Sequence, residues 1–255
     1  MKKPLGQSLL WSLSAEALHT IEYKTNYSRA LDFVIKNKKA KILDTAAGTG
    51  FPTFDLARLG YENLAVSDLD AEAVNRLKSS SNCPEKLSFF QSRWQDLSKN
   101  VSEKVDVIIN SDNSFVYMDG WLGGEHVEGV EAVMKKAAEV LQNFFDVTAA
   151  GGMVIVGLGK HYTPSAGQSA FCRNFELTKD DEHYKIEWAG ELDWDKRIQT
   201  WTTKIESESF ADSFVRTSYL LTKEELVAQM LGIGFKNVYI VEPNDTRDNL
   251  IVGLK

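Results

Sequence analysis

A cluster of acids and glycines near the start of the chain could form a ligand site. Asp44 ends the apolar run "KILD", and Gly48 and Gly50 follow it in the small-residue loop "TAAGTG". Asp68 ends the next apolar run, "NLAVSD". Glycines let a backbone approach a ligand closely, and the amides of a helix that begins after such a loop point toward that ligand. The pattern predicts a site for a nucleoside-containing ligand; a strand-to-helix turn that binds nothing is the alternative.

The acids distinguish between the ligands that such a loop could bind. The loop is not a complete G-x-G-x-x-G dinucleotide motif, because Thr53 stands at the third glycine position. Asp44 would lie unfavourably near the diphosphate of a dinucleotide, whereas S-adenosylmethionine (SAM) carries a sulfonium and an ammonium that attract a carboxylate. Asp68 can accept hydrogen bonds from both ribose hydroxyls, and Asp70 either competes for this role or caps the following helix. We therefore expect SAM, with its ribose on Asp68.

Strand and helix patterns alternate along the part of the chain that would position this site. Short apolar runs predict buried strands at 41–46, 63–68, 87–94, 105–112 and 151–159. Amphipathic spacing predicts helices at 20–37, 51–60, 69–80, 126–145 and 221–235. The last of these begins with a capping box formed by Thr222 and Glu225. Such alternation is typical of a doubly wound parallel sheet.

Two further segments depart from that alternation. Period-two stretches between residues 163 and 216 predict antiparallel strands, and residues 236–255 read as two strands joined by a polar turn. We therefore expect an α/β fold: a doubly wound, Rossmann-like sheet of seven strands with a C-terminal antiparallel hairpin and an inserted antiparallel lid. Residues 1–162 and 217–255 would form the SAM-binding domain with an amphipathic or irregular N-terminal arm, and residues 163–216 would form the substrate lid.

Composition limits the class of partner. A net charge of −7 and a pI of about 5.2 disfavour nucleic acid, because an acidic surface repels its phosphates. No apolar run approaches the length of a membrane span, and the N-terminus does not favour a signal peptide. The two cysteines, Cys83 and Cys172, have no metal-ligand spacing. We expect a cytoplasmic protein with a small-molecule substrate and without metal, nucleic acid or membrane; a homo-oligomer is compatible with the sequence.

Several motifs make the chain resemble the class I SAM-dependent methyltransferases. They are the segments "ILDTAAGTG", "AVSDLD" and "VDVIINSDNSF" and the closing hairpin. Within that superfamily the chain resembles the glycine N-methyltransferase group, which includes the glycine/sarcosine enzymes. This finer likeness depends on four stretches: "TIEYK" at 20–24, "SRWQDL" at 92–97, "NSF" at 113–115 and "RNFE" at 173–176. The likeness covers most of the chain and implies methyl transfer from SAM.

The resemblance implies a set of cofactor-binding residues. They are Asp44, Ala46, Gly48 and Gly50 at the methionine portion of SAM, Asp68 at the ribose, Arg93 and Trp94 at the adenine, and Leu69, Ser111 and Tyr117 elsewhere along the cofactor. For Trp94 the alternative is a core aromatic residue that follows a strand.

The same resemblance implies a substrate site of Asn113, Arg173 and Tyr184. Asn113 and Arg173 look like the family's ligands for a substrate carboxylate, and Tyr184 would help to close the pocket. Arginine suits this role because its guanidinium can bind a carboxylate through two hydrogen bonds; a surface ion pair on the lid is the alternative for Arg173. An anchored carboxylate would aim the amine at the methyl group. The amine must be neutral to attack, but its proton can leave to water.

Three positions depart from the pattern of the glycine N-methyltransferase group. By alignment, Ser12 and His19 stand where the group has a tyrosine at the substrate and an arginine at the SAM carboxylate, and Asp112 replaces the glycine before Asn113. His19 could still donate to a carboxylate or be an ordinary helix residue. Asp112 could favour a cationic substrate or simply face solvent.

These features predict an N-methyltransferase that acts on a small amino acid such as glycine or sarcosine. Another small amine, a carboxylate or a natural product is the alternative acceptor, because Trp188, Trp194 and Trp201 of the lid could hold a methylated ammonium by cation–π contact. A non-catalytic SAM-binding protein is a third hypothesis.

Overall fold

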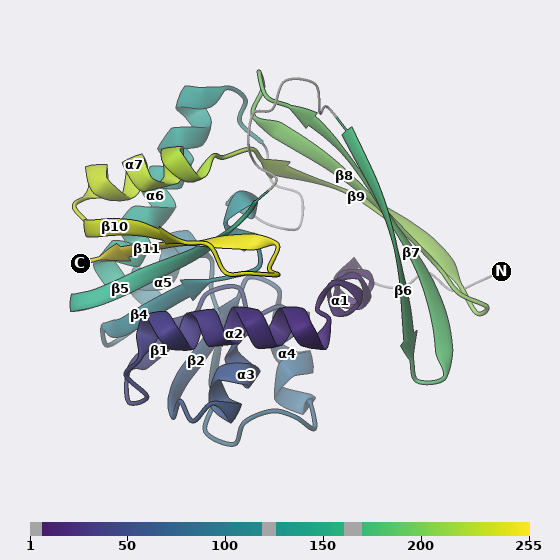
Figure 1. Ribbon diagram of the computed structural model, residues 1–255, viewed down its shortest axis with the longest axis horizontal. Coiled ribbons are helices and arrows are strands. Elements are labelled where there is room, and N and C mark those ends of the chain that lie inside the picture. The colour runs from purple at the N-terminus through teal and green to yellow at the C-terminus, as the bar shows by residue number, and fades with distance from the viewer. Residues whose placement is uncertain (1–6, 119–125, 161–169) are drawn as a thin grey trace.

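The main sheet of the expected fold is present. The computed structural model describes residues 7–118, 126–160 and 170–255, and its larger sheet has the strand order β10-β11-β5-β4-β1-β2-β3 (Figure 1). The strands are β1 (Lys41–Asp44), β2 (Asn63–Asp68), β3 (Ser88–Gln91), β4 (Val105–Asn110), β5 (Thr148–Gly159), β10 (Lys236–Val241) and β11 (Asp248–Leu254). Strands β1 to β5 pair in parallel, whereas β11 pairs antiparallel with both β5 and β10. The seven-stranded sheet and its C-terminal hairpin are therefore confirmed.

Helices cover both faces of this sheet. Successive residues of a strand point to opposite faces, so each strand supplies side chains to the core on either side. The helices on one face are α2 (Ile21–Ile35), α3 (Thr53–Arg58) and α4 (Ala71–Ser79), and those on the other are α5 (Leu97–Asn100), α6 (Val130–Val147) and α7 (Lys223–Ile233). In β1, for example, Ile42 packs into the first of these two cores and Leu43 into the second. The capping box predicted at the start of α7 is confirmed.

A second, antiparallel sheet forms the inserted lid. Its strands, in the order β6-β7-β8-β9, are β6 (Ala170–Lys179), β7 (Glu182–Asp193), β8 (Ile198–Glu206) and β9 (Ala211–Tyr219). In Figure 1 this sheet stands beyond the edge of the main sheet at which the parallel strands end. The first predicted domain boundary, between residues 162 and 163, lies outside the described residues. The second, between residues 216 and 217, lies inside β9, so the strand that ends the lid continues past the predicted boundary to Tyr219.

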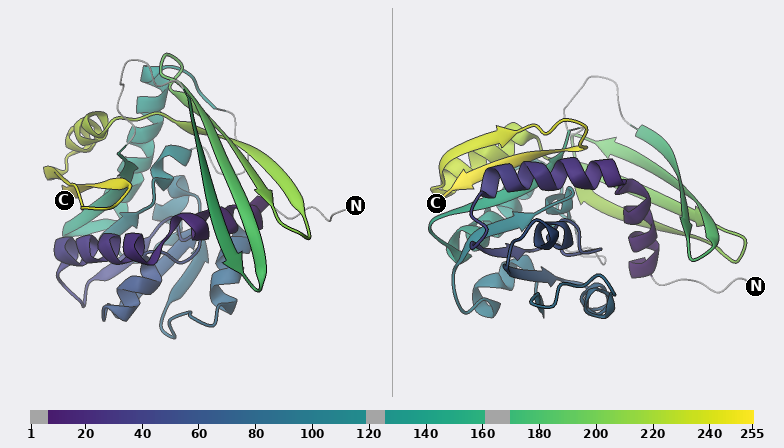
Figure 2. Two further views of the ribbon diagram at one scale, coloured as in Figure 1. Left: turned by 45° about the vertical axis from the view of Figure 1, so that its right-hand side comes forward. Right: turned by 60° about the horizontal axis from the view of Figure 1, so that its bottom comes forward.

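The N-terminal arm is a helix, α1 (Gln7–Leu18), that lies between the two sheets (Figure 2). Leu10, Leu13 and Leu18 of α1 pack against the inner face of the lid. The ring of Trp11 stacks on that of Trp188 in β7, with centroids 5.7 Å apart. The lid therefore packs on the main domain through α1. No helix in the described ranges is long and apolar enough to cross a membrane.

The strand expected at 41–46 stops at Asp44, and two further strands also end earlier than the sequence pattern predicted. The strand expected at 87–94 stops at Gln91, and the one expected at 105–112 stops at Asn110. Short 3-10 turns follow these two strands, at Trp94–Asp96 and at Ser114–Tyr117. These turns lie at the carboxyl edge of the sheet, so the residues that leave the strands are the ones available to a ligand.

Candidate functional site

Two adjoining cavities lie at the carboxyl ends of the parallel strands. The first has a volume of about 380 Å³ and the second of about 60 Å³. Trp11, Asp112 and Tyr117 line both cavities, so the two spaces meet at these side chains. The segments after β1, β2 and β3 line the first cavity, while the lid and the C-terminal hairpin line the second. This arrangement suits two ligands that must be held against each other.

Asp44 organises the loop that follows β1. Its side chain is buried; one carboxylate oxygen accepts a hydrogen bond from the Ala46 amide (3.1 Å) and the other from the Thr53 hydroxyl (2.7 Å). Burial raises the pKa of Asp44 to about 7, although these two hydrogen bonds oppose the rise. Asp44 is not one of the residues that line the first cavity. It therefore supports the loop from behind and connects it to the first turn of α3.

The two glycines of the loop have different roles. Gly48 lines the first cavity, and its φ is +47°. Gly50 does not line it; its φ is +90°, and a Cβ atom placed there would lie 2.9 Å from the ring of Phe54. Gly50 thus permits α3 to pack closely against the loop, while Thr45, Ala46, Gly48 and Thr49 form the surface of the cavity.

Asp68 is held at the end of β2 by two backbone amides. The Gly48 amide donates to its Oδ2 atom and the Asp70 amide to its Oδ1 atom, both at 2.9 Å. Burial raises the pKa of Asp68, although these hydrogen bonds oppose the rise. Asp68 and Leu69 both line the first cavity, and each carboxylate oxygen can accept a second hydrogen bond. Asp70 caps α4, with its side chain accepting from the Glu72 amide at 2.8 Å, as its position predicted.

Arg93 and Trp94 form another part of the first cavity, after β3. The Trp94 indole donates to the Thr45 carbonyl oxygen at 2.6 Å, and its ring stacks on that of Phe115 with centroids 6.3 Å apart. Trp94 therefore contacts the core with one part of its surface and the cavity with another. Its two predicted roles, cavity wall and core aromatic, are compatible with each other.

The register of the lid brings aromatic and basic side chains to the second cavity. Phe171 and Arg173 of β6 stand opposite Gly190 and Trp188 of β7, and Trp201 of β8 stands opposite Gly190. A Cβ atom at Gly190 would lie 2.4 Å from the ring of Phe171, so glycine leaves the space that this ring needs. Phe171, Arg173, Trp188 and Trp201 all line the second cavity.

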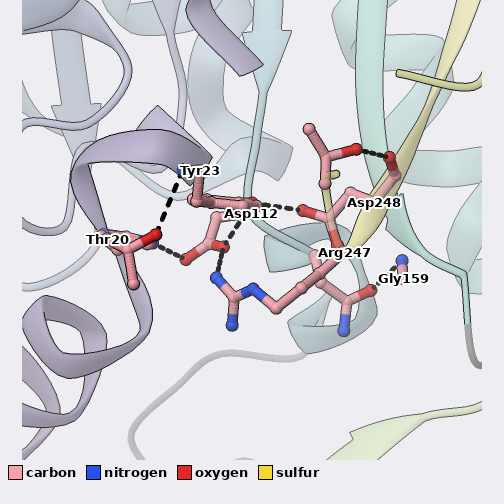
Figure 3. A network of polar contacts seen from close by, with 9 residues as sticks. Thr20, Tyr23, Asp112, Gly159, Arg247 and Asp248 are labelled. Atoms are coloured by element: carbon pink, nitrogen blue, oxygen red, sulfur yellow. Dashed lines mark hydrogen bonds and ion pairs between the residues drawn. The ribbon is translucent and has the colours of Figure 1, made fainter. Parts of the chain in front are cut away.

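Asp112 is the centre of a partly buried polar network at the junction of the cavities (Figure 3). His19 Nε2 lies 2.8 Å from its Oδ2 atom, while Arg247 Nη2 lies 3.0 Å and the Tyr23 hydroxyl 3.3 Å from its Oδ1 atom. Burial alone would raise the pKa of Asp112, but the charges of His19 and Arg247, with hydrogen bonds from His19 and Tyr23, hold it below its ordinary value. Asp112 is therefore an anion fixed between the two cavities.

A second carboxylate, Asp248, lies on the other side of Tyr23 (Figure 3). The Tyr23 hydroxyl is 3.1 Å from its Oδ2 atom. Asp248 is 3% exposed and lines the second cavity. Burial and then the negative charge of Asp112 raise the pKa of Asp248 to about 7. The second cavity therefore contains two carboxylates with different proton affinities.

The residues predicted to bind substrate are only partly brought together. Asn113 and Arg173 both line the second cavity, although the Oδ1 atom of Asn113 accepts a hydrogen bond from the Gly159 amide at 3.0 Å. Tyr184 lines neither cavity. It lies in the core of the lid, where its hydroxyl donates to Glu182 at 3.1 Å.

The same geometry places four further residues of the sequence prediction. Ser12 lines the first cavity, whereas Ser111 is buried and lines neither; its neighbour Asp112 lines both. His19 does pair with a carboxylate, but with that of Asp112. Asp112 faces the cavities and its partners rather than bulk solvent.

Several residues of the site had no predicted role, among them Trp11, Tyr23, Phe171, Arg247 and Asp248. Trp11 lies in a helix whose packing partner is far away in the sequence, so no local pattern places it. Asp248 did give a signal, since it precedes the apolar run "LIVGL". Because β11 runs antiparallel to β5, its first residue lies at the edge where the parallel strands end. In the described parts of the chain, no group of His, Cys, Asp and Glu side chains is arranged to hold a metal ion.

Comparison with known proteins adds a family match and structural neighbours. Residues 36–211 match a family model described as a methyltransferase domain. No curated protein matches the sequence. The solved structure of DesVI from Streptomyces venezuelae has a TM-score of 0.75 and 13% identity, covering 98% of this chain and 99% of that one.

Two other solved structures also match over nearly their whole length. KedS8, a sugar N-methyltransferase from Streptoalloteichus sp., has a TM-score of 0.74 and 12% identity, covering 100% of this chain and 95% of that one. SAM-bound CalS10, an amino pentose methyltransferase from Micromonospora echinaspora, has a TM-score of 0.71 and 11% identity, covering 100% of this chain and 99% of that one. At such identities the likeness concerns the fold.

Proposed function

Because this chain belongs to the methyltransferase-domain family, we propose that its first cavity holds SAM and that its second cavity holds an amine that receives the methyl group. The chain is a SAM-dependent methyltransferase by its family. The identity of the acceptor and the residues that bind each ligand are the parts proposed here.

The first cavity fits SAM in size and in the chemistry of its walls. Its volume of about 380 Å³ is within the range of small-molecule sites. Asp68, fixed by two amides, would accept the ribose hydroxyls, and the bare backbone at Ala46 and Gly48 would lie along the methionine portion. Trp94 and Arg93 would flank the adenine. When bound, SAM supplies a methyl group on a positively charged sulfur.

The single observation that supports an amine as the methyl acceptor is the pair of carboxylates, Asp112 and Asp248, that line the second cavity. A buried anion attracts a cationic group and disfavours another anion. A protonated amine would therefore be drawn toward these two carboxylates, and a carboxylate on the same acceptor would have to face Arg173, which also lines the cavity. Asp112 also lines the first cavity, so an amine held there would lie beside the methyl donor.

The skeleton that carries this amine has two candidates. An amino sugar is the first, since CalS10 is described as an amino pentose methyltransferase and KedS8 as a sugar N-methyltransferase, and both match this chain over its whole length. The aromatic side chains of the second cavity would cover the faces of such a ring. A small amino acid, the acceptor implied by the resemblance to the glycine N-methyltransferase group, is the second. Asn113 and Arg173 support it because both line the same cavity.

The volume of the second cavity is compatible with both candidates. It is about 60 Å³, room for roughly four to six water-sized groups. That space would hold a whole glycine-sized molecule or the amine-bearing end of a larger one. Size therefore limits what enters the second cavity to a few atoms around the nitrogen.

A methyl-transfer assay with radiolabelled SAM tests the proposal. The panel contains amino sugars, glycine, sarcosine, and for each amine its matched hydroxyl compound. We expect transfer to at least one amine and none to its hydroxyl counterpart; transfer only to hydroxyl or carboxyl compounds would overturn the proposed acceptor class.

The variant Arg173→Ala separates the two skeletons. If the acceptor is an amino acid, this variant should raise its KM sharply while SAM affinity stays nearly unchanged, because a carboxylate has lost its cationic partner. An exposed arginine elsewhere, Arg58, gives the matched control Arg58→Ala. An unchanged KM would remove Arg173 as a carboxylate ligand and favour the sugar skeleton.

A further inference from the structure

The two carboxylates at the second cavity share one hydroxyl group. Tyr23 of α2 lies 3.1 Å from Asp248 Oδ2 and 3.3 Å from Asp112 Oδ1, and Figure 3 shows its side chain extending toward both. A hydroxyl has one proton to donate, so it can satisfy only one of the two carboxylates at a time. Asp248 is buried and Asp112 half-buried, and two such acids held this close favour a state in which one of them takes up a proton.

The positive charges near this pair are distributed unequally. His19 and Arg247 both form ion pairs with Asp112, at 2.8 Å and 3.0 Å. Asp248, by contrast, accepts its described side-chain hydrogen bond from the neutral hydroxyl of Tyr23. The titratable and charged groups that act on Asp248 are Tyr23 and Tyr27 from α2, Asp112 after β4, Lys160 after β5 and the adjacent Arg247. The ammonium of Lys160 donates instead to the Pro243 carbonyl oxygen at 2.7 Å.

We propose that Asp248 is the catalytic base that removes a proton from the acceptor's ammonium before methyl transfer, while Asp112 remains ionised and holds that ammonium in place. This assignment rests on the proposed amine acceptor. It differs from the expectation that water takes the proton, because the buried carboxylate of Asp248 lines the cavity in which the nitrogen would lie.

The step balances in protons and electrons. The ammonium arrives with an extra proton, which moves to a carboxylate oxygen of Asp248 and leaves a neutral amine with a lone pair. That lone pair forms a bond to the methyl carbon as the carbon–sulfur bond breaks, and the electrons of the broken bond stay on sulfur. The methylated product leaves as an ammonium, and Asp248 releases its proton to solvent when the product departs.

The proton affinities of the two acids fit this division of roles. Asp112 is held below its ordinary pKa by His19 and Arg247, so it stays charged when a proton is offered. Burial and the charge of Asp112 raise the pKa of Asp248 toward the working pH, where a general base is most effective.

The test compares wild type with Asp248→Asn across pH, using the amine found in the transfer assay. At pH 7 we expect kcat of Asp248→Asn to fall by about 10²-fold or more. Above pH 7 the ratio of wild-type kcat to variant kcat should shrink roughly tenfold per pH unit, because the neutral amine then forms without a base. Asp245→Asn is the matched control: Asp245 is exposed in the same hairpin, and its φ of +55° is one that asparagine also adopts. It should keep the wild-type profile.

Two results would overturn the assignment of Asp248 to the base. One is an Asp248→Asn enzyme with wild-type kcat at pH 7, and the other is a loss that is the same at every pH, as a purely structural role would give. Both are distinct from failure of the proposed function, in which the wild-type protein itself methylates no amine. Binding of S-adenosylhomocysteine by calorimetry reports whether each variant is folded.

A second variant keeps the proposal falsifiable if Asp248→Asn does not fold. The hydrogen bond from Tyr23 lowers the pKa of Asp248, so Tyr23→Phe should move the acidic limb of the kcat–pH profile to higher pH. A limb that stays in place, with activity retained, would contradict a base at Asp248.

Discussion

Asp44 gives the clearest link between a single buried group and the stability of the whole protein. Its carboxylate is fully buried behind the loop after β1, where it accepts hydrogen bonds from Ala46 and Thr53. Asparagine has nearly the same shape, and it can still accept from the Ala46 amide while its own amide donates to the Thr53 hydroxyl. The change Asp44→Asn therefore removes a titratable group and leaves the loop its contacts.

The magnitude follows from the pKa of Asp44. Burial raises this pKa from 3.8 to about 7 in the folded protein. Between these values the folded protein holds a proton that the unfolded chain has lost, so wild-type stability falls as pH rises and stops falling once pH passes the folded pKa. From pH 5 to pH 7 this is two pH units at about 1.4 kcal/mol each. Asp44→Asn should thus gain roughly 3 kcal/mol relative to wild type between pH 5 and pH 8.

The assay is urea denaturation of both proteins at several pH values between 5 and 8. Comparing variant with wild type cancels the pH dependence of other groups, including Asp248, provided that the sites are independent. Asp181→Asn provides the control, because Asp181 is exposed in the β6–β7 turn with a φ of +63° that asparagine tolerates. A stability difference between Asp44→Asn and wild type that is constant across pH would refute the reasoning.

Two further predictions concern the walls of the first cavity. Asp68→Ala should weaken binding of S-adenosylhomocysteine by roughly 30-fold or more, about 2 kcal/mol, because hydrogen bonds from ribose to a charged acceptor are lost. Asp70→Ala should instead cost about 1 kcal/mol of stability through the lost cap; calorimetry and denaturation separate the two, and equal binding by both variants would contradict the assignment. Gly50→Ala should destabilise the protein by about 1–3 kcal/mol more than Gly60→Ala, since both glycines have a φ of +90° but only Gly50 would contact Phe54. Similar losses in denaturation experiments would show that the Phe54 contact is easily relieved.

Local sequence patterns were sufficient wherever the structure depends on neighbouring residues. The run "NLAVSD" is β2 at its predicted bounds, and Asp70 caps α4 because the cap bond spans only two residues. The Thr222 capping box is local in the same sense. Pattern reasoning was less successful at strand ends: the strand predicted at 105–112 included Ser111 and Asp112, but β4 ends at Asn110, the last residue that pairs with β5.

Contacts between distant segments decided the rest of the candidate site. Trp11 and Trp188 stack although a whole domain separates them in sequence. Tyr184 looked suited to close a pocket, but the register of β7 places it in the core of the lid. Gly50 looked like a ligand-binding glycine, but it does not line the first cavity, and its φ of +90° and the close packing of Phe54 are what require it.

The sequence by itself determined the alternation of strands and helices, the glycine loop, and the acid at the end of β2, because each is encoded by residues a few positions apart. The tertiary structure alone decided that Asp112 and Asp248 meet at Tyr23, and that Arg247 pairs with one of them. Those residues come from α2, the end of β4 and the C-terminal hairpin, and an antiparallel last strand is what returns the chain to the edge of the sheet where the site forms. Charge and burial, which set the proton affinity of each acid, exist only once these segments are packed together.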